Sequence, residues 1–167
     1  MALELDRGAL GVGDAFGKQS LAAAPLEHPE AGHLRLSVAD EVDRRDRPLH
    51  VLVNNAGILE NERQGSANGI ELTWATKVQA YFLLTELLLP RLHASAPARI
   101  VNVASELAGG LDLDDVQFER RPYRGTAAYA QSKQADRMLT WDAARRLEGS
   151  GVTANSIASR AREHDGL

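Results

Sequence analysis

Three side chains in the second half of the chain have the types and spacing of a proton-transfer site: Ser105, Tyr129 and Lys133. Tyr129 and Lys133 are four residues apart in the segment AYAQSKQA, so a helix would place them one turn apart on the same face. An ammonium beside a phenol favours the phenolate, which can act as acid or base on a carbonyl or alcohol oxygen. A serine hydroxyl could hold the same oxygen through a hydrogen bond. Such a site carries no hydride of its own, so a cofactor has to supply it.

Alone, a tyrosine and a lysine at this spacing are more often two surface residues of a helix, so the elements around them decide the interpretation. Apolar, β-rich runs predict strands at residues 50–53, 98–105 and 151–158. Longer segments with helical spacing of apolar residues predict helices around 71–93 and 127–149. This order predicts an α/β fold with a doubly wound parallel sheet in three α/β/α layers. Ligands of such sheets bind at the carboxyl ends of the strands, where the candidate residues would gather.

The composition narrows the kind of partner. The 167 residues are enough for one domain with a hydrophobic core, and 44% of them are apolar and 25% charged, as in ordinary globular proteins. A net charge of −4 leaves no basic excess for a nucleic acid. The histidines are scattered and there is no cysteine, so we predict neither a metal site nor a disulfide. We expect a cytoplasmic protein without a signal peptide or membrane span, because the most apolar run, 81–90, is too short.

Several motifs, in order along the chain, resemble those of the short-chain dehydrogenase/reductase family. NNAG follows the first predicted strand, RIVNVAS ends the second, YAQSK opens the second helix, and AARRLEGSGVTANS leads into the third strand. The resemblance covers roughly residues 48–157. The long polar interval between Ser105 and Tyr129 is similar to that of the retinol-dehydrogenase-like branch.

The resemblance implies an oxidoreductase that interconverts an alcohol and a carbonyl by hydride transfer with NADP or NAD. Tyr129 would be the catalytic acid/base, Lys133 would favour its phenolate and hold the nicotinamide ribose, and Ser105 would position the substrate oxygen. Ala104 replaces the first residue of the family's Ser-Ser pair. The two long helices pair between subunits in the family, so the resemblance also suggests a homodimer.

Cofactor binding is expected to involve both halves of the chain. Three residues of NNAG would pack against the adenosine side of NAD(P): Asn54, Ala56 and Gly57. NNAG is also typical of a tight turn after a strand. Upstream, GALGVG offers Gly11 and Gly13 for a phosphate-binding loop, although its first spacing is shorter than the family's. In the rival alignment MALELDRGA is the remnant of the first helix and that loop is absent. In both alignments Asp40 is the candidate adenine contact.

Departures from the family pattern bear on activity. Residues 1–48 form a divergent first half, shorter than the usual three strand–helix steps require. Lys77 stands where the family has a catalytic Asn. A lysine has no acceptor for holding a water and would repel a nearby Lys133, so we expect an impaired proton relay that Lys77→Asn restores. The charged tail, 158–167, lacks the family's Pro-Gly turn, substrate cover and last strand, which predicts loose substrate selection.

We therefore expect a single NAD(P)-binding, Rossmann-like domain over residues 1–167, family-like at 49–157, with an incomplete first half and a missing C-terminal strand. Its substrate would be a small-molecule alcohol or carbonyl compound. The alternative is a catalytically impaired or truncated family member that binds a nucleotide or a protein partner. An extended relative acting on nucleotide sugars also uses a Tyr–Lys pair, but NNAG and the short chain disfavour it.

Overall fold

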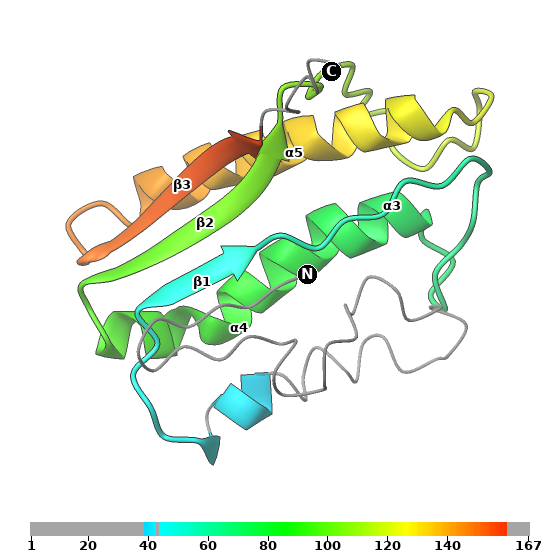
Figure 1. The fold of residues 1–167 in the computed structure, drawn as a ribbon. Coiled ribbons are helices and arrows are strands. Elements are labelled where there is room, and N and C mark those ends of the chain that lie inside the picture. The colour runs from blue at the N-terminus through cyan, green and yellow to red at the C-terminus, as the bar shows by residue number, and fades with distance from the viewer. Residues whose placement is uncertain (1–38, 43, 160–167) are drawn as a thin grey trace, which may run out of the picture.

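The centre of the protein is a three-stranded parallel sheet, in a computed structural model that describes residues 39–42 and 44–159 (Figure 1). The strands follow one another across the sheet in the order β1-β2-β3. This order and direction confirm the predicted α/β class with its strands side by side. The candidate loop glycines, Gly11 and Gly13, lie outside the described residues, as does most of the predicted tail.

The three strands are β1 (Val51–Asn54), β2 (Ala98–Ser105) and β3 (Val152–Ser159). Each boundary is within one residue of the predicted one. Successive side chains of a strand point to opposite faces of the sheet, so buried and less buried positions alternate along β1 and through most of β2. Leu52 and Ile100, which are paired across the two strands, are both fully buried.

One continuous helical stretch joins β1 to β2, and it has three parts: α3 (Leu72–Trp74), the π-helix η1 (Ala75–Gln79) and α4 (Ala80–Ala94). It confirms the first predicted long helix, but the π-helical turn was not predicted from the sequence. π-Helical turns are rare in proteins overall, and those that occur are often found at functional sites. The second long helix, α5 (Gly125–Arg146), joins β2 to β3.

The hydrophobic core lies between the sheet and these two long helices. Leucines of α4 spaced by one turn, Leu84, Leu88 and Leu92, are fully buried in one cluster with Leu52 and Ile100. Ala143 of α5 and Leu147, the residue that follows α5, belong to the same cluster. Figure 1 shows α4 alongside β1 and α5 alongside β2 and β3. The long helices of the described residues cover one face of the sheet, so these residues do not test the third layer of the predicted α/β/α arrangement.

Within the described part of the chain, no helix has the length and apolar character needed to cross a membrane.

Candidate active site

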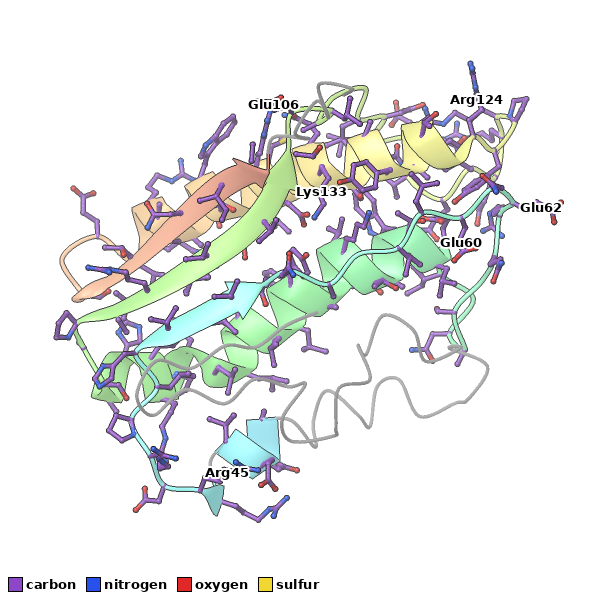
Figure 2. The ribbon with its side chains drawn as sticks, in the orientation of Figure 1. Arg45, Glu60, Glu62, Glu106, Arg124 and Lys133 are labelled. Atoms are coloured by element: carbon purple, nitrogen blue, oxygen red, sulfur yellow. The ribbon has the colours of Figure 1, made fainter. Side chains whose placement is uncertain are left out.

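The predicted catalytic residues lie where the end of β2 meets the first turns of α5. Ser105 is the last residue of β2, and Tyr129 and Lys133 follow near the start of α5. The Lys133 ammonium donates a hydrogen bond of 2.5 Å to the carbonyl oxygen of Val103 in β2. Arg137, one turn later, donates to the carbonyl oxygen of Ser105 at 2.6 Å. Figure 2 shows Lys133 beside the end of β2, with Glu106 just beyond the strand. Strand end and helix are thus in direct contact, as the sequence predicted.

The Lys133 side chain is almost completely buried and forms an ion pair with Asp136. Its Nζ lies 3.1 Å from Asp136 Oδ2 and 5.1 Å from the centre of the Tyr81 ring. An ammonium has three N–H donors, and Val103 and Asp136 take two of them. One donor of Lys133 is therefore left for a ligand.

Asp136 was not singled out in the sequence, although it is part of this cluster. Its side chain is fully buried, and burial raises the pKa of the carboxyl to about 6, against the opposing effect of the Lys133 and Lys77 charges. Its second oxygen, Oδ1, has no hydrogen-bond partner among the described residues. The sequence contained one signal for Asp136. A residue three positions after Lys133 on a helix lies on the same face as Lys133, so an acidic residue there faces the same part of the interior.

Lys77 also belongs to the site, and its π-helical turn brings it against Tyr129. Its Nζ lies 3.6 Å from the centre of the Tyr129 ring. The side chain is fully buried, and its Nζ finds no hydrogen-bond partner within the described residues. Burial first, and the positive charge of Lys133 second, lower the pKa of Lys77 to about 7, although Asp136 and Glu71 act in the opposite direction. The repulsion expected between the two lysines is therefore present.

Ser105 and Tyr129 differ in burial. Ser105 is buried, and its hydroxyl accepts a hydrogen bond of 3.2 Å from the backbone N–H of Leu107. That bond leaves the hydroxyl proton of Ser105 available to a substrate oxygen. Tyr129 is half-buried, with one face of its ring covered by Lys77. Their catalytic roles stay predictions.

The NNAG segment is tied into the interior by hydrogen bonds. The Asn54 amide is fully buried and donates to Asn102 at 2.8 Å and to Thr85 at 3.2 Å. The Ala56 carbonyl accepts from the Tyr81 hydroxyl at 2.7 Å. The side-chain NH2 of Asn54 thus holds β1 to β2 and α4, while its Oδ1 has no hydrogen-bond partner among the described residues. The cofactor contact of Asn54 stays a prediction. Asn102 in turn donates to Thr140 of α5 at 2.8 Å.

Gly57 is exposed at the end of the same segment and lies against Lys77. A Cβ at this position would be 3.2 Å from Lys77 Cε and 3.7 Å from its Nζ. A glycine therefore keeps the backbone open directly above the buried lysine. Asp40 lies elsewhere, exposed on a short helical segment, residues 39–42, rather than at the end of a strand. The cofactor contacts of Gly57 and Asp40 stay predictions.

The polar segment between β2 and α5, residues 106–124, forms an ordered wall beside the site. The buried Asp115 carboxylate accepts hydrogen bonds from the backbone N–H groups of Glu119, Arg120 and Arg121. The Gln117 side chain accepts from the backbone N–H of Glu71 at 2.7 Å. The polar interval is therefore anchored to the start of α3.

Glu71 is the residue that receives this anchor. It is fully buried, and its carboxylate caps α3 by accepting from the backbone N–H groups of Thr73 at 2.9 Å and Trp74 at 2.7 Å. The Tyr123 hydroxyl donates to it at 3.1 Å. Burial and the Glu71 charge raise the pKa of Tyr123 to about 12. The carboxylate thus joins the wall to the helix that carries Lys77.

The donor set at this edge fits a dinucleotide better than a metal. Lys133 keeps one N–H free, Gly57 leaves the backbone open, and Tyr129 is half-buried. A free lysine N–H can bind a ribose hydroxyl, and an open glycine backbone allows a flat ring to approach. Among the residues that the structure describes, no group of three or more His, Cys, Asp or Glu side chains could hold a metal ion.

Comparison with known proteins agrees with this geometry. The short chain dehydrogenase family matches residues 34–162, and the chain belongs to this family. The chain is 38% identical over 139 residues to "Retinol dehydrogenase 13" of Homo sapiens, a match that covers 78% of this chain and 42% of that protein. It is 42% identical over 114 residues to "Retinol dehydrogenase 12" of Homo sapiens, covering 67% of this chain and 36% of that one. The chain therefore spans about two-fifths of the length of these relatives.

Solved structures show the same Rossmann-like fold. An uncharacterised protein from Mycobacterium paratuberculosis superimposes with a TM-score of 0.65 at 33% identity, over 79% of this chain and 47% of that one. A short-chain dehydrogenase/reductase family oxidoreductase from Brucella ovis, in complex with a partially ordered NAD, matches with a TM-score of 0.56 at 27% identity. That match covers 80% of this chain and 59% of the Brucella chain. The predicted Rossmann-like class is thereby confirmed. The sheet formed by the described residues is only part of the sheet of that fold.

Proposed function

We propose that this chain is an NAD(P)-dependent oxidoreductase that interconverts an alcohol and a carbonyl compound by hydride transfer, with Tyr129 as acid/base. The observation that supports it most is the position of Lys133, buried against the end of β2, one turn after Tyr129 and with one N–H unused. The family and its retinol dehydrogenase relatives favour the same activity. The cofactor would be NADP or NAD, since relatives of known structure are described with one or the other.

The residues of the chain would act on the oxygen of the substrate. Ser105 donates a hydrogen bond to that oxygen and fixes it beside Tyr129. Tyr129 takes the hydroxyl proton when an alcohol is oxidised and returns a proton when a carbonyl is reduced. Lys133 would bind ribose hydroxyls with its remaining N–H. NAD(P), when bound, supplies or accepts the hydride, and Gly57 and its neighbours would hold the adenosine side.

Titration of the purified protein with NADH and with NADPH, followed by nicotinamide fluorescence, tests cofactor binding. We expect saturable binding of at least one of the two. Turnover is then measured with a panel of alcohols and aldehydes that includes retinol and retinal. Tyr129→Phe should retain cofactor binding and lose about a hundredfold or more in kcat, because it removes the acid/base hydroxyl. A folded protein that binds neither nucleotide would contradict the proposal.

Lys77 favours a second candidate, a family member that binds the cofactor but turns over slowly. Its buried Nζ lies on the ring of Tyr129, and its positive charge and that of Lys133 repel one another. Binding of NADH without turnover of any substrate would select this alternative. Recovery of turnover in Lys77→Asn would then identify the lysine as the cause.

We also propose that the chain forms a homodimer through the outer faces of α4 and α5. Large apolar side chains are exposed there: Phe82 at 48%, Met138 at 44% and Trp141 at 63%. Light scattering of the wild type and of Trp141→Glu would test this, with a dimer expected only for the former. The cytoplasmic location rests on the sequence and stays a prediction.

A further inference from the structure

The Lys77 side chain has a chemical capacity that the proposed hydride transfer does not use. Its Nζ is fully buried and has no hydrogen-bond partner among the described residues. An ammonium has three N–H donors, and leaving all of them unpaired in the interior is costly. The neutral amine carries no charge, so its burial costs less. This position therefore favours the free amine, which is a nucleophile.

Two features of this position are known to activate lysine amines. An amine becomes nucleophilic when it is removed from water or when a second cation lies close to it. Lys77 has both features, because its Nζ is buried and the positive charge of Lys133 acts on it from α5. Tyr129 of α5 contacts the Nζ with the face of its ring, whereas the charges of Asp136 in α5 and Glu71 at the start of α3 favour the ammonium. The balance lowers the pKa of Lys77 to about 7, so about half of the amine is uncharged at neutral pH.

Gly57 places this amine close to the surface. The glycine is exposed at the end of NNAG, and a Cβ at this position would lie 3.2 Å from Lys77 Cε and 3.7 Å from its Nζ. Apart from the chain neighbours of Gly57, the next nearest heavy atom to that point is the carbonyl oxygen of Asn55 at 4.0 Å. Because residue 57 has no side chain, the Nζ lies just beneath an exposed part of the backbone. A small carbonyl compound that binds against Gly57 therefore comes within reach of the amine.

We propose that Lys77 is a nucleophilic lysine that forms a Schiff base with a small aldehyde in the active site. The inference rests on the proposed oxidoreductase function, which makes aldehydes substrates or products of this site. It adds a covalent state of the protein that hydride transfer does not require. This state holds the aldehyde beside the ring of Tyr129, so it would slow turnover.

The step conserves atoms and electrons. The Nζ lone pair attacks the carbonyl carbon, and the oxygen takes up a proton while the nitrogen loses one, which gives a carbinolamine. The hydroxyl group then leaves as water with the second proton of the nitrogen, and a C=N bond replaces the C=O bond. Nothing is oxidised or reduced, so the step needs neither NAD(P) nor another redox reagent. Loss of the ammonium form of Lys77 also ends its repulsion with Lys133.

Reductive trapping identifies the reacting amine directly. The full chain is incubated at pH 7 with propanal and sodium cyanoborohydride, which reduces the imine to a stable propylamine, in the absence of any nucleotide. Nα-acetyl-lysine in the same solution provides an ordinary lysine amine for comparison. Peptide mass spectrometry then locates the label among the three lysines of the chain, Lys18, Lys77 and Lys133.

We expect the propyl group on Lys77, formed about tenfold or more faster than on Nα-acetyl-lysine at pH 7. Between pH 7 and pH 9 the uncharged form of an ordinary lysine increases about a hundredfold, whereas that of Lys77, with a pKa of about 7, increases only about twofold. The ratio of the two rates should therefore fall about fiftyfold over this range. A lysine with ordinary reactivity would keep a constant ratio.

Two substitutions of Lys77 confirm the position of the label. Lys77→Arg keeps a positive charge and Lys77→Met removes it, but neither has an amine, so both should lose the label. Lys18→Arg is the matched control and should keep the label on Lys77. Circular dichroism of each protein checks that it is folded.

The outcomes distinguish the two proposals. A folded wild type in which Lys77 stays unlabelled, reacts no faster than Nα-acetyl-lysine at pH 7, or keeps a constant rate ratio up to pH 9 would overturn the Schiff base. The oxidoreductase function would still stand, because trapping requires no nucleotide. A wild type that binds neither NADH nor NADPH and turns over no alcohol or aldehyde would overturn the function, and with it the identification of an aldehyde substrate as the partner of Lys77.

Discussion

Replacement of Lys77 tests the electrostatics of the site through stability as well as activity. A pKa difference of one corresponds to about 1.4 kcal/mol. Lowering the pKa of Lys77 from 10.5 to about 7 therefore costs its buried ammonium about 5 kcal/mol relative to the neutral amine. In the unfolded chain the same lysine stays protonated until its ordinary pKa of 10.5. Between pH 7 and 10.5 the unfolded state thus binds more protons than the folded state at this position.

Stability rises with pH wherever the unfolded state binds more protons. The wild type should therefore gain about 2 kcal/mol of unfolding free energy between pH 7 and 9, relative to Lys77→Asn, which has no charge to lose. The wild type should gain the same amount relative to Lys77→Met. Any change in packing caused by the substitution is the same at both pH values, so it cancels when the two are compared. Asp136, with a pKa of about 6, changes little over this range. Urea denaturation of the three proteins at pH 7 and pH 9 gives the values.

The kcat values of the same variants distinguish the effect of removing the ammonium of Lys77 from the effect of supplying an amide. Lys77→Asn removes the ammonium and supplies an amide that can hold a water, so its kcat should exceed that of the wild type. Lys77→Met removes only the ammonium and should gain less. A stability difference that stays constant from pH 7 to pH 9 would refute the buried-charge reasoning. Equal kcat in the wild type and Lys77→Asn would refute the impaired relay.

Two further substitutions test the elements that hold the site. Gly125→Ala should lower the unfolding free energy by about 1–3 kcal/mol in urea, because its Cβ would lie 2.0 Å from the backbone oxygen of Glu60. Gly109→Ala, whose Cβ would meet nothing within 4 Å, is the control, and equal losses in both would contradict the packing argument. Glu71→Ala should cost about 1–3 kcal/mol by removing the cap of α3 and the acceptor of the Tyr123 hydroxyl. Its near-ultraviolet titration should also place the pKa of Tyr123 below the wild-type value of about 12, and an unshifted titration would count against the contact.

The sequence was sufficient for the sheet, the long helices and the gathering of Ser105, Tyr129 and Lys133 at the junction of β2 and α5. Each of these depends on local periodicity and on the rule that parallel strands end at the same edge. The repulsion between Lys77 and Lys133 was also expected, from the family motif around Lys77. The contact of Lys77 with the ring of Tyr129 depends on a π-helical turn, which leaves no clear pattern in the sequence.

Other features depend on contacts between residues far apart along the chain. The packing of Asn54 against a cofactor stays a prediction, and the sequence did not indicate the hydrogen bonds of its side-chain NH2 to Asn102 and Thr85 inside the fold. In the sequence Asp136 is one more polar residue of a predicted helix, and only the folded structure shows that it is buried in an ion pair with Lys133. The sequence shows the wall of residues 106–124 only as part of a long polar interval, because its attachment through Gln117 to Glu71 requires two segments to meet in space.

The close approach of Gly57 to Lys77 makes the effect of a substitution at one of these positions depend on the residue at the other. A methyl group at residue 57 would press on Lys77 Cε at 3.2 Å, and the buried lysine has little room to move aside. The shorter side chain of Lys77→Asn would relieve that pressure, so Gly57→Ala should be tolerated far better after the lysine is replaced than before. Contacting residues of this kind have non-additive effects. The order in which substitutions can accumulate at this edge of the sheet is therefore constrained, with position 77 changing before position 57.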